Sequence, residues 1–139
     1  MGEELMVIDA SSIDVEDIET KIANLLASRA DVDSNGQSAC DHFGLVLSKV
    51  FRLLPSDCQT RYWDLDDFSC DFANRTGDVV TLQGISSWLA GGEDCDRFRL
   101  DLALDKVPLL YSCKFTSSTT GKQIAYVGKT PEGWLINAP

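Results

Sequence analysis

The chain has 139 residues, enough for one domain with a sizeable core. Its 22 acidic side chains outnumber 12 Lys and Arg, which gives a formal net charge of −10. This charge argues against nucleic-acid binding, which needs clustered basic side chains, and against attraction to anionic membranes. A hydrophobic content of 44% is ordinary for a globular chain and argues against wholesale disorder.

Targeting signals and cysteines bear on the compartment. The first residues, MGEELMVIDASS, contain no basic region followed by a long apolar run, and no apolar stretch approaches the length of about 18 residues that spans a membrane. Free thiols explain the odd number of cysteines, which include no CxxC pair, better than disulfides or a zinc site: Cys40, Cys58, Cys70, Cys95 and Cys113. The sequence therefore predicts a cytoplasmic protein.

The first half of the chain favours helices. After a short strand or extended lead-in over 5–8, apolar residues at helical spacing predict a helix over 14–29. Glu16, Asp17 and Glu19 fall in its first turn, where negative charge is favourable. A polar loop is expected over 31–39 and a second helix over 40–54, ended by Pro55. Residues 56–75 have no sustained period and predict a short helix or turns.

The second half favours strands. A short strand is expected from Asp78 to the break at Gly84, then one or two helical turns over 85–90. Alternating polarity predicts further strands over 97–105, 109–117, 123–129 and 134–137. The predicted class is α+β, a single domain over 1–139. It has a helical part over 14–54 and an antiparallel meander over 78–137 that can curve into a cone.

Residues 31–36, DVDSNG, resemble the start of an EF-hand calcium loop, with oxygen ligands at Asp31, Asp33 and Asn35. The twelfth position of that loop is His42 instead of a bidentate Glu, so the coordination shell is incomplete. We favour a polar interhelical turn, with calcium binding as the minor alternative. No cofactor or metal site is predicted.

Residues 62–72 interleave four acids with four aromatic residues. One interpretation places the aromatics in the core and the acids on a solvated surface. Another is an interface for a basic partner, in which Tyr62 and Trp63 are anchors and the aspartates Asp64, Asp66, Asp67 and Asp71 steer association. A third makes Asp66 or Asp67 a general base at a pocket mouth.

Residues 41–139 resemble the nuclear transport factor 2-like superfamily, the cone fold. The resemblance lies in a helix, the turn Trp63–Phe68, a strand reaching Gly84, a helical turn through Trp88 and a meander ending in Thr130–Ile136. It implies a sheet curled around helices with a pocket at the wide end. Members include isomerases, dehydratases, ligand carriers and immunity proteins that neutralise toxins, so the fold does not decide the function.

The favoured functional prediction is a non-enzymatic, acidic cytosolic inhibitor or immunity protein that neutralises a basic toxin or nuclease. The alternative is a small-molecule-binding protein, or an isomerase or dehydratase. In that enzyme, His42, Asp66 or Asp67 would shuttle protons beside Tyr62, Trp88 or Tyr111. A calcium module is the weaker alternative, and an open sheet edge leaves a homodimer as an option.

Overall fold

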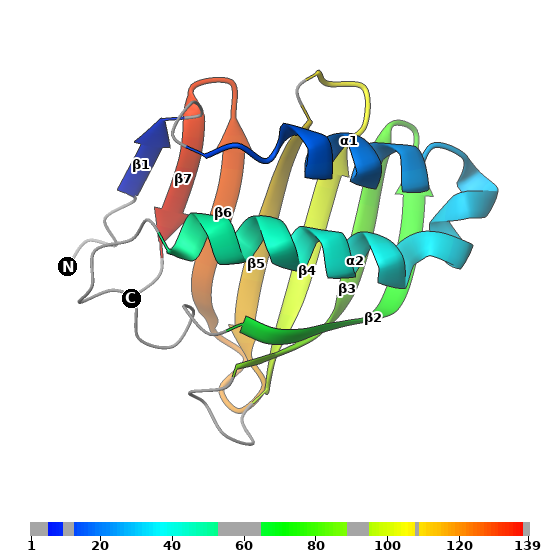
Figure 1. The fold of residues 1–139 in the computed structure, drawn as a ribbon. Helices are drawn as coiled ribbons and strands as arrows, with labels where there is room; N and C mark the ends of the chain where they lie inside the picture. Colours follow the sequence, from blue (N-terminus) through cyan, green and yellow to red (C-terminus); the bar gives the residue numbers. More distant parts are fainter. Residues whose placement is uncertain (1–5, 10–12, 53–64, 89–94, 108, 138–139) are drawn as a thin grey trace.

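The computed structural model describes residues 6–9, 13–52, 65–88, 95–107 and 109–137. The described elements follow the order β1 (Met6–Asp9), α1 (Glu16–Leu25), α2 (Arg29–Phe51), β2 (Leu65–Thr76), β3 (Val79–Trp88), β4 (Cys95–Ala103), β5 (Leu110–Ser117), β6 (Gln123–Thr130) and β7 (Gly133–Asn137). Two helices thus precede a run of six strands, which confirms the predicted α+β class (Figure 1).

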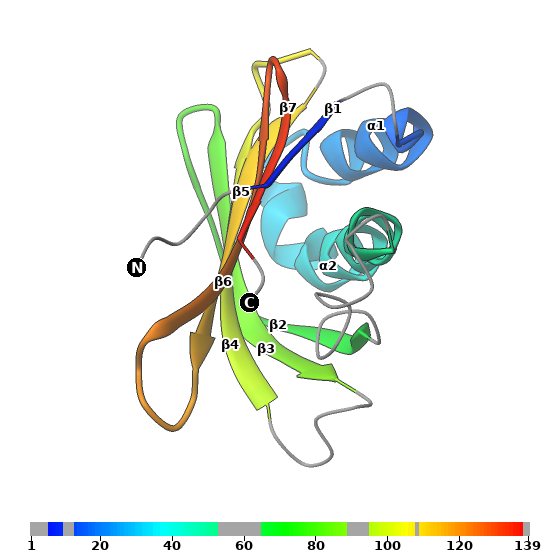
Figure 2. The same ribbon diagram turned by 90° about the vertical axis from the view of Figure 1, so that its left-hand side faces the viewer.

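The strands form one antiparallel sheet in the order β1-β7-β6-β5-β4-β3-β2. Each strand from β2 to β7 pairs with the next, and β1 returns to the far side of β7, pairing Met6 with Ile136. β1 and β2 are the two edges among the described strands, so the predicted meander is present but does not close. Both helices cover the same face of the twisted sheet (Figure 2).

Helix α2 is longer than the sequence predicts. Ser28 begins it by accepting a hydrogen bond from the Asp31 backbone N–H at 3.2 Å, and the helix continues to Phe51. The predicted loop over 31–39 is therefore wrong, because Val32, Ala39 and Cys40 form a buried helical stripe with Phe43. The EF-hand interpretation also fails: residues two apart on a helix point about 200° apart, so Asp33 faces away from Asp31 and Asn35.

Strands β2 and β3 occupy 65–75 and 85–88, where a short helix or turns and then helical turns were predicted; the remaining parts of these predictions, 56–64 and 89–90, lie outside the described residues. β2 carries irregularities between Leu65 and Asp67 and between Cys70 and Phe72, which break the two-residue alternation. β3 continues through Gly84, which pairs with Cys70 on one side and Phe98 on the other. The sheet consequently includes strands that lie outside the predicted range 78–137.

The core lies between the helices and the covered sheet face. Its largest fully buried side chains come from both layers: Ile22, Leu26, Phe43, Leu47, Phe51, Leu82, Leu100, Leu102, Phe115, Trp134 and Ile136. Aromatic contacts join the layers, since the Phe43 ring meets the Tyr111 ring edge-on at 5.2 Å between centroids. The covered face of the sheet is therefore filled by side chains along α2.

Candidate functional site

A buried polar cluster lies within this core, under α1. The Lys129 ammonium donates to both carboxylate oxygens of Glu19, at 2.7 Å and 2.6 Å. The Tyr111 hydroxyl donates to the same carboxylate at 2.7 Å, and the Trp134 indole N–H donates to the Tyr111 oxygen at 3.3 Å. Lys129 also lies 4.9 Å from the centroid of the Trp134 ring. All four side chains are buried.

The sheet register explains why these side chains meet. Tyr111 pairs with Lys129, and Lys129 pairs with Trp134, so three neighbouring strands place them in one row on the covered face. Glu19 reaches the row from α1, in the first turn. Burial raises the pKa of Tyr111 well above its ordinary value, and the Glu19 charge adds to this effect. Tyr111 therefore stays a protonated donor to Glu19 at neutral pH.

A cavity of about 480 Å³ opens beside the cluster. One wall is α1, with Glu16, Glu19, Thr20, Ala23 and Asn24, and the other is the segment after β4, with Leu104, Lys106, Val107 and Leu109. This volume lies in the range of small-molecule sites, which combine an apolar lining with a few placed polar groups. The cavity thus joins an apolar wall to a buried carboxylate.

The basic groups near the cavity are paired with carboxylates, whereas an acidic group on its rim is exposed. Lys129 neutralises Glu19, and Lys106 lies 3.6 Å from the Asp105 carboxylate. Glu16 is exposed on the rim. The two cationic groups near the cavity therefore already face carboxylates, and Glu16 gives the rim a negative charge.

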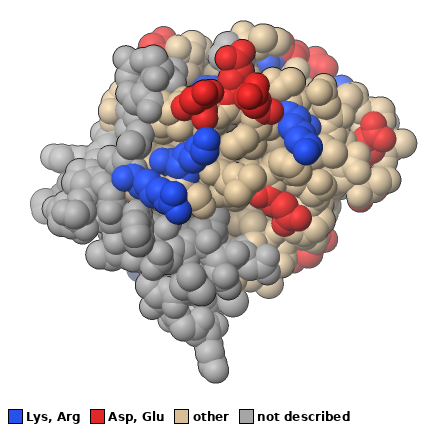
Figure 3. All heavy atoms as spheres, in the orientation of Figure 1, with Lys and Arg blue, Asp and Glu red and all other residues tan. Residues whose placement is uncertain are grey.

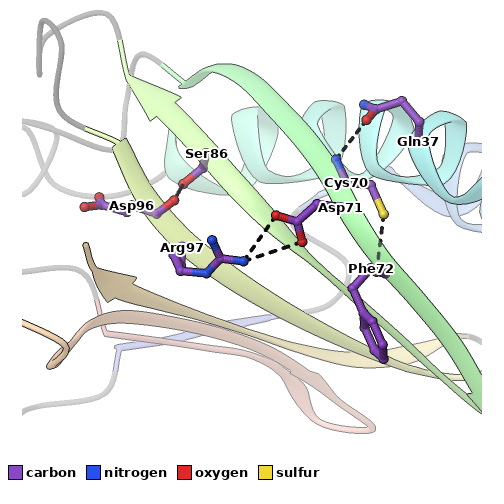
Figure 4. Close-up of polar contacts among 7 residues, drawn as sticks. All are labelled: Gln37, Cys70, Asp71, Phe72, Ser86, Asp96 and Arg97. Carbon is purple, nitrogen blue, oxygen red and sulfur yellow. Dashed lines mark hydrogen bonds and ion pairs between the residues drawn. The ribbon is translucent and has the colours of Figure 1, made fainter.

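The predicted partner-binding residues are only partly described. Tyr62, Trp63 and Asp64 lie outside the described residues, and so do the side chains of Asp66 and Asp67, whose backbone belongs to β2. The Asp71 side chain is 51% exposed and pairs with Arg97 of β4 at 3.2 Å (Figure 4). Asp71 therefore lies on the sheet face away from the helices with a basic neighbour, and the interface stays a prediction.

Of the residues of the enzyme alternative, the structure describes the side chains of His42 and Tyr111. His42 is a half-buried residue of α2, and its Nδ1 lies 2.7 Å from the Ser38 carbonyl oxygen. Tyr111 belongs to the buried cluster, and the side chain of Trp88 lies outside the described part of the chain. Of the two described candidates, Tyr111 is the one that contacts the cavity-lining Glu19.

Sequence reasoning missed Glu19 and Lys129, although both carried a signal. Glu19 lies at helical spacing between the apolar Val15, Ile22 and Leu26, so it interrupts the stripe that faces the core. Lys129 continues the inward alternation of Ala125 and Val127. Each element thus carries a charged residue at a core position, and the two charges have opposite signs. This pattern was the available indication of a buried ion pair.

Charges on the helix-bearing face are mixed. Figure 3 shows acidic and basic side chains side by side over the described part of this face. Asp14 and Asp17 are exposed near α1, as are Lys21, Lys49 and Arg52. Among the described residues no group of three or more His, Cys, Asp or Glu could hold a metal ion, and no described helix is long and apolar enough to cross a membrane.

Comparison with protein-family models, with curated proteins and with solved structures gave no significant match to this chain.

Proposed function

We propose that this protein binds a small molecule in the cavity between α1 and the segment after β4. The observation that carries the proposal is the cavity itself, about 480 Å³, which is lined by apolar side chains and by Glu16 and Glu19. The ligand would place an apolar body against Ala23, Leu104 and Leu109.

The ion pair supports this assignment because buried charges are costly. Removing two charges from water costs several kcal/mol per ion, and their attraction often does not exceed this cost. An apolar pair of similar volume would stabilise the fold at least as well. Ionisable groups in clefts are enriched at functional sites, and Glu19 of this pair is one of the residues that line the cavity.

The ligand class follows from the charge balance of the rim. Glu16 provides a negative charge at the opening, whereas Lys106 is close to Asp105. A cationic group would be attracted to Glu16, and an anionic group would be repelled by it. An amphipathic amine of modest size is therefore the ligand class that fits best.

The proposal is binding without catalysis. Both oxygens of Glu19 accept hydrogen bonds from Lys129, and one of them also accepts from Tyr111. A general base needs a free acceptor directed at the substrate. Glu19 is engaged as a structural anion, and the Tyr111 hydroxyl donates its proton to it.

The test uses 2-phenylethylamine as a cationic probe and 3-phenylpropionate as an anionic probe of similar size. In a ¹H–¹⁵N NMR titration of the full chain, we expect the amine to shift amide resonances of residues 16–24 and 104–109. The dissociation constant should be about 1 mM, as for other small fragments. The carboxylate should bind more weakly.

Two matched variants locate the binding. Ala23→Phe fills the cavity and should abolish the shifts, whereas Ala30→Phe adds the same ring at an exposed position of α2 and should not. Far-ultraviolet circular dichroism checks that both fold. Equal binding by the two variants, or shifts scattered over the sheet, would exclude this cavity as the site.

A second candidate remains the predicted binding of a basic protein through residues 62–71. It is favoured by the net charge of −10 and by the exposed Asp71 side chain on β2. The two proposals concern different surfaces, because Asp71 lies on β2 and the cavity lies between α1 and the end of β4. An association rate constant measured at low and high salt tests this one separately.

A further inference from the structure

Helix α2 crosses strand β2 with one face in continuous contact. A Cβ atom placed on Gly36 would lie 3.3 Å from the Cβ of Ala73 and 3.4 Å from the sulfur of Cys70. Two turns later, the Phe43 and Phe68 rings are 6.1 Å apart between centroids. Residues 36, 40 and 43 follow one another on a helix face, and they approach β2 at residues 73, 70 and 68. Cys40 therefore faces Cys70.

A side-chain amide fixes this contact. Gln37 donates from its Nε2 to the Phe68 carbonyl oxygen at 2.8 Å. Its Oε1 accepts from the Cys70 backbone N–H at 2.8 Å (Figure 4). Phe68 and Cys70 lie on an edge strand, so Gln37 satisfies backbone groups that a further strand would otherwise bind. The helix is thus held in register with β2 at the cysteine.

The two thiols differ in access. Cys40 is fully buried, whereas Cys70 is half-buried and its sulfur donates to the Phe72 carbonyl oxygen at 3.4 Å. Burial is the main cause that raises the pKa of Cys40, and Cys70 adds to it, so Cys40 stays a thiol at neutral pH. An oxidant would reach Cys70 first because part of its surface is open.

We propose that Cys40 and Cys70 are a redox-sensitive pair that forms a reversible disulfide between α2 and β2 when the protein meets hydrogen peroxide. This inference is independent of the proposed small-molecule site. In the described structure both cysteines are reduced.

The chemistry balances with one peroxide. The Cys70 thiolate attacks one peroxide oxygen, the O–O bond breaks, and the sulfur becomes a sulfenic acid while the other oxygen leaves as hydroxide and takes up a proton to form water. The Cys40 sulfur then attacks the Cys70 sulfur, losing its proton as the S–S bond forms. The S–O bond breaks and the hydroxyl leaves as a second water. Two thiols are oxidised by two electrons, and one peroxide is reduced to two waters.

Cys113 is an unsuitable partner for Cys70. It lies on β5, three strands from β2, and three strand spacings amount to about 14 Å. A disulfide requires Cα atoms within about 7 Å. Among the three cysteines whose side chains the structure describes, Cys40 is therefore the one that can pair with Cys70.

Tryptic mapping tests the pairing because each cysteine of the chain falls in its own peptide. Cleavage after Lys and Arg places Cys40 in peptide 30–49 and Cys70 in peptide 62–75. After hydrogen peroxide treatment of the full chain and alkylation of remaining thiols, we expect these two peptides to be joined with the loss of two hydrogen atoms. Dithiothreitol should separate them. The unfolding midpoint of the oxidised protein should rise by about 5 °C.

Two variants provide the controls. Cys70→Ser should remove the joined peptide and the rise in midpoint, and Cys113→Ser should keep both. A joined peptide containing Cys113 (residues 107–114), or a Cys70 that ends as sulfinic acid while Cys40 remains alkylated, would overturn the proposal. Serine at position 70 replaces a half-buried sulfur by a similar group, and circular dichroism checks the fold.

Discussion

Glu19 and Lys129 are opposite charges in a part of the core where their side chains are 4% and 6% exposed. Three donated hydrogen bonds satisfy the carboxylate, so neither oxygen is left without a partner. Breaking such a pair is far more costly than replacing it, because the remaining charge stays buried alone. The effects of substituting the two residues on the free energy of unfolding should therefore be coupled.

A double-mutant cycle measures this coupling. We expect Glu19→Gln alone to lower the free energy of unfolding by about 3 kcal/mol, and Lys129→Met alone by a similar amount. The double variant should be destabilised by at least about 1 kcal/mol less than the sum, since it leaves no isolated charge. Urea unfolding followed by tryptophan fluorescence gives the values.

The matched control for this cycle is an exposed pair. Asp71 and Arg97 are about half exposed, and removing either should cost less than about 1 kcal/mol. Additive effects of the Glu19 and Lys129 variants would contradict the coupling. Variants that are individually neutral would show that the buried charges contribute nothing to stability.

The role of Glu19 could not be predicted from the sequence of its own helix. In the sequence, an acid in the first turn of a helix is explained by the helix dipole, as it is for Glu16 and Asp17. The buried role of Glu19 depends on Lys129, which is 110 residues away. The residues around Glu19 and those around Lys129 give no sign that the two side chains meet, so the cavity site could not be predicted from either segment alone.

Gly84 governs the contact between strands β2 and β3. A Cβ atom at this position would overlap the Ser69 carbonyl oxygen and lie 2.9 Å from the Phe98 ring. The strand approaches its neighbours closely because the residue has no side chain, next to the irregularity between Cys70 and Phe72. Glycine is needed here for space, whereas the sequence pattern alone predicts that the strand ends at this residue.

Gly84→Ala and Gly77→Ala separate two reasons for a glycine, namely space and backbone freedom. Gly77 has a φ of 62°, and a Cβ atom added there would meet no other atom within 4 Å, so alanine causes only backbone strain of about 1 kcal/mol. Gly84→Ala must displace backbone, and we expect a loss of about 3 kcal/mol. Chemical denaturation ranks the two variants. An equal or reversed order would mean that β2 can shift away from β3 without cost.

The elements that sequence reasoning located share one property: their own side-chain pattern is regular. β4 alternates strictly, as in Phe98, Leu100 and Leu102, and the predicted ranges of β4 to β7 agree closely with the structure. β2 was missed because two irregularities interrupt its alternation. The first part of α2 was missed because exposed Asp33 and Ser34 made it resemble a loop, while Val32 and Gly36 on its other face are buried.

The charge of the whole molecule is unevenly distributed along the chain. Residues 1–5, 53–64 and 89–94 contain six acids and one Arg, a balance of −5, which is half of the net −10. Acids and bases both lie on the described helix face (Figure 3). A basic protein would be attracted by the whole field at long range, but the orientation of binding depends on where the excess lies.

The predicted partner interface can be tested by comparing two charge reversals of equal size. Asp66→Lys with Asp67→Lys, and Asp33→Lys with Glu132→Lys, both raise the net charge by four units, from −10 to −6. A basic protein retained from lysate by the wild-type chain at low salt serves as the binding probe. The Asp66/Asp67 variant should associate about tenfold more slowly than the Asp33/Glu132 variant, because charges near the contact dominate steering.

Salt dependence completes this comparison, because screening acts over about 8 Å at physiological ionic strength. The difference in association rate constants should shrink as salt rises, while dissociation changes less. Equal rates for the two variants at low salt would mean that net charge alone attracts the partner, and the interface at residues 62–71 would be wrong. Binding by the Ala23→Phe variant should be unaffected, since the described residue of the acidic segment, Asp71, does not line the cavity.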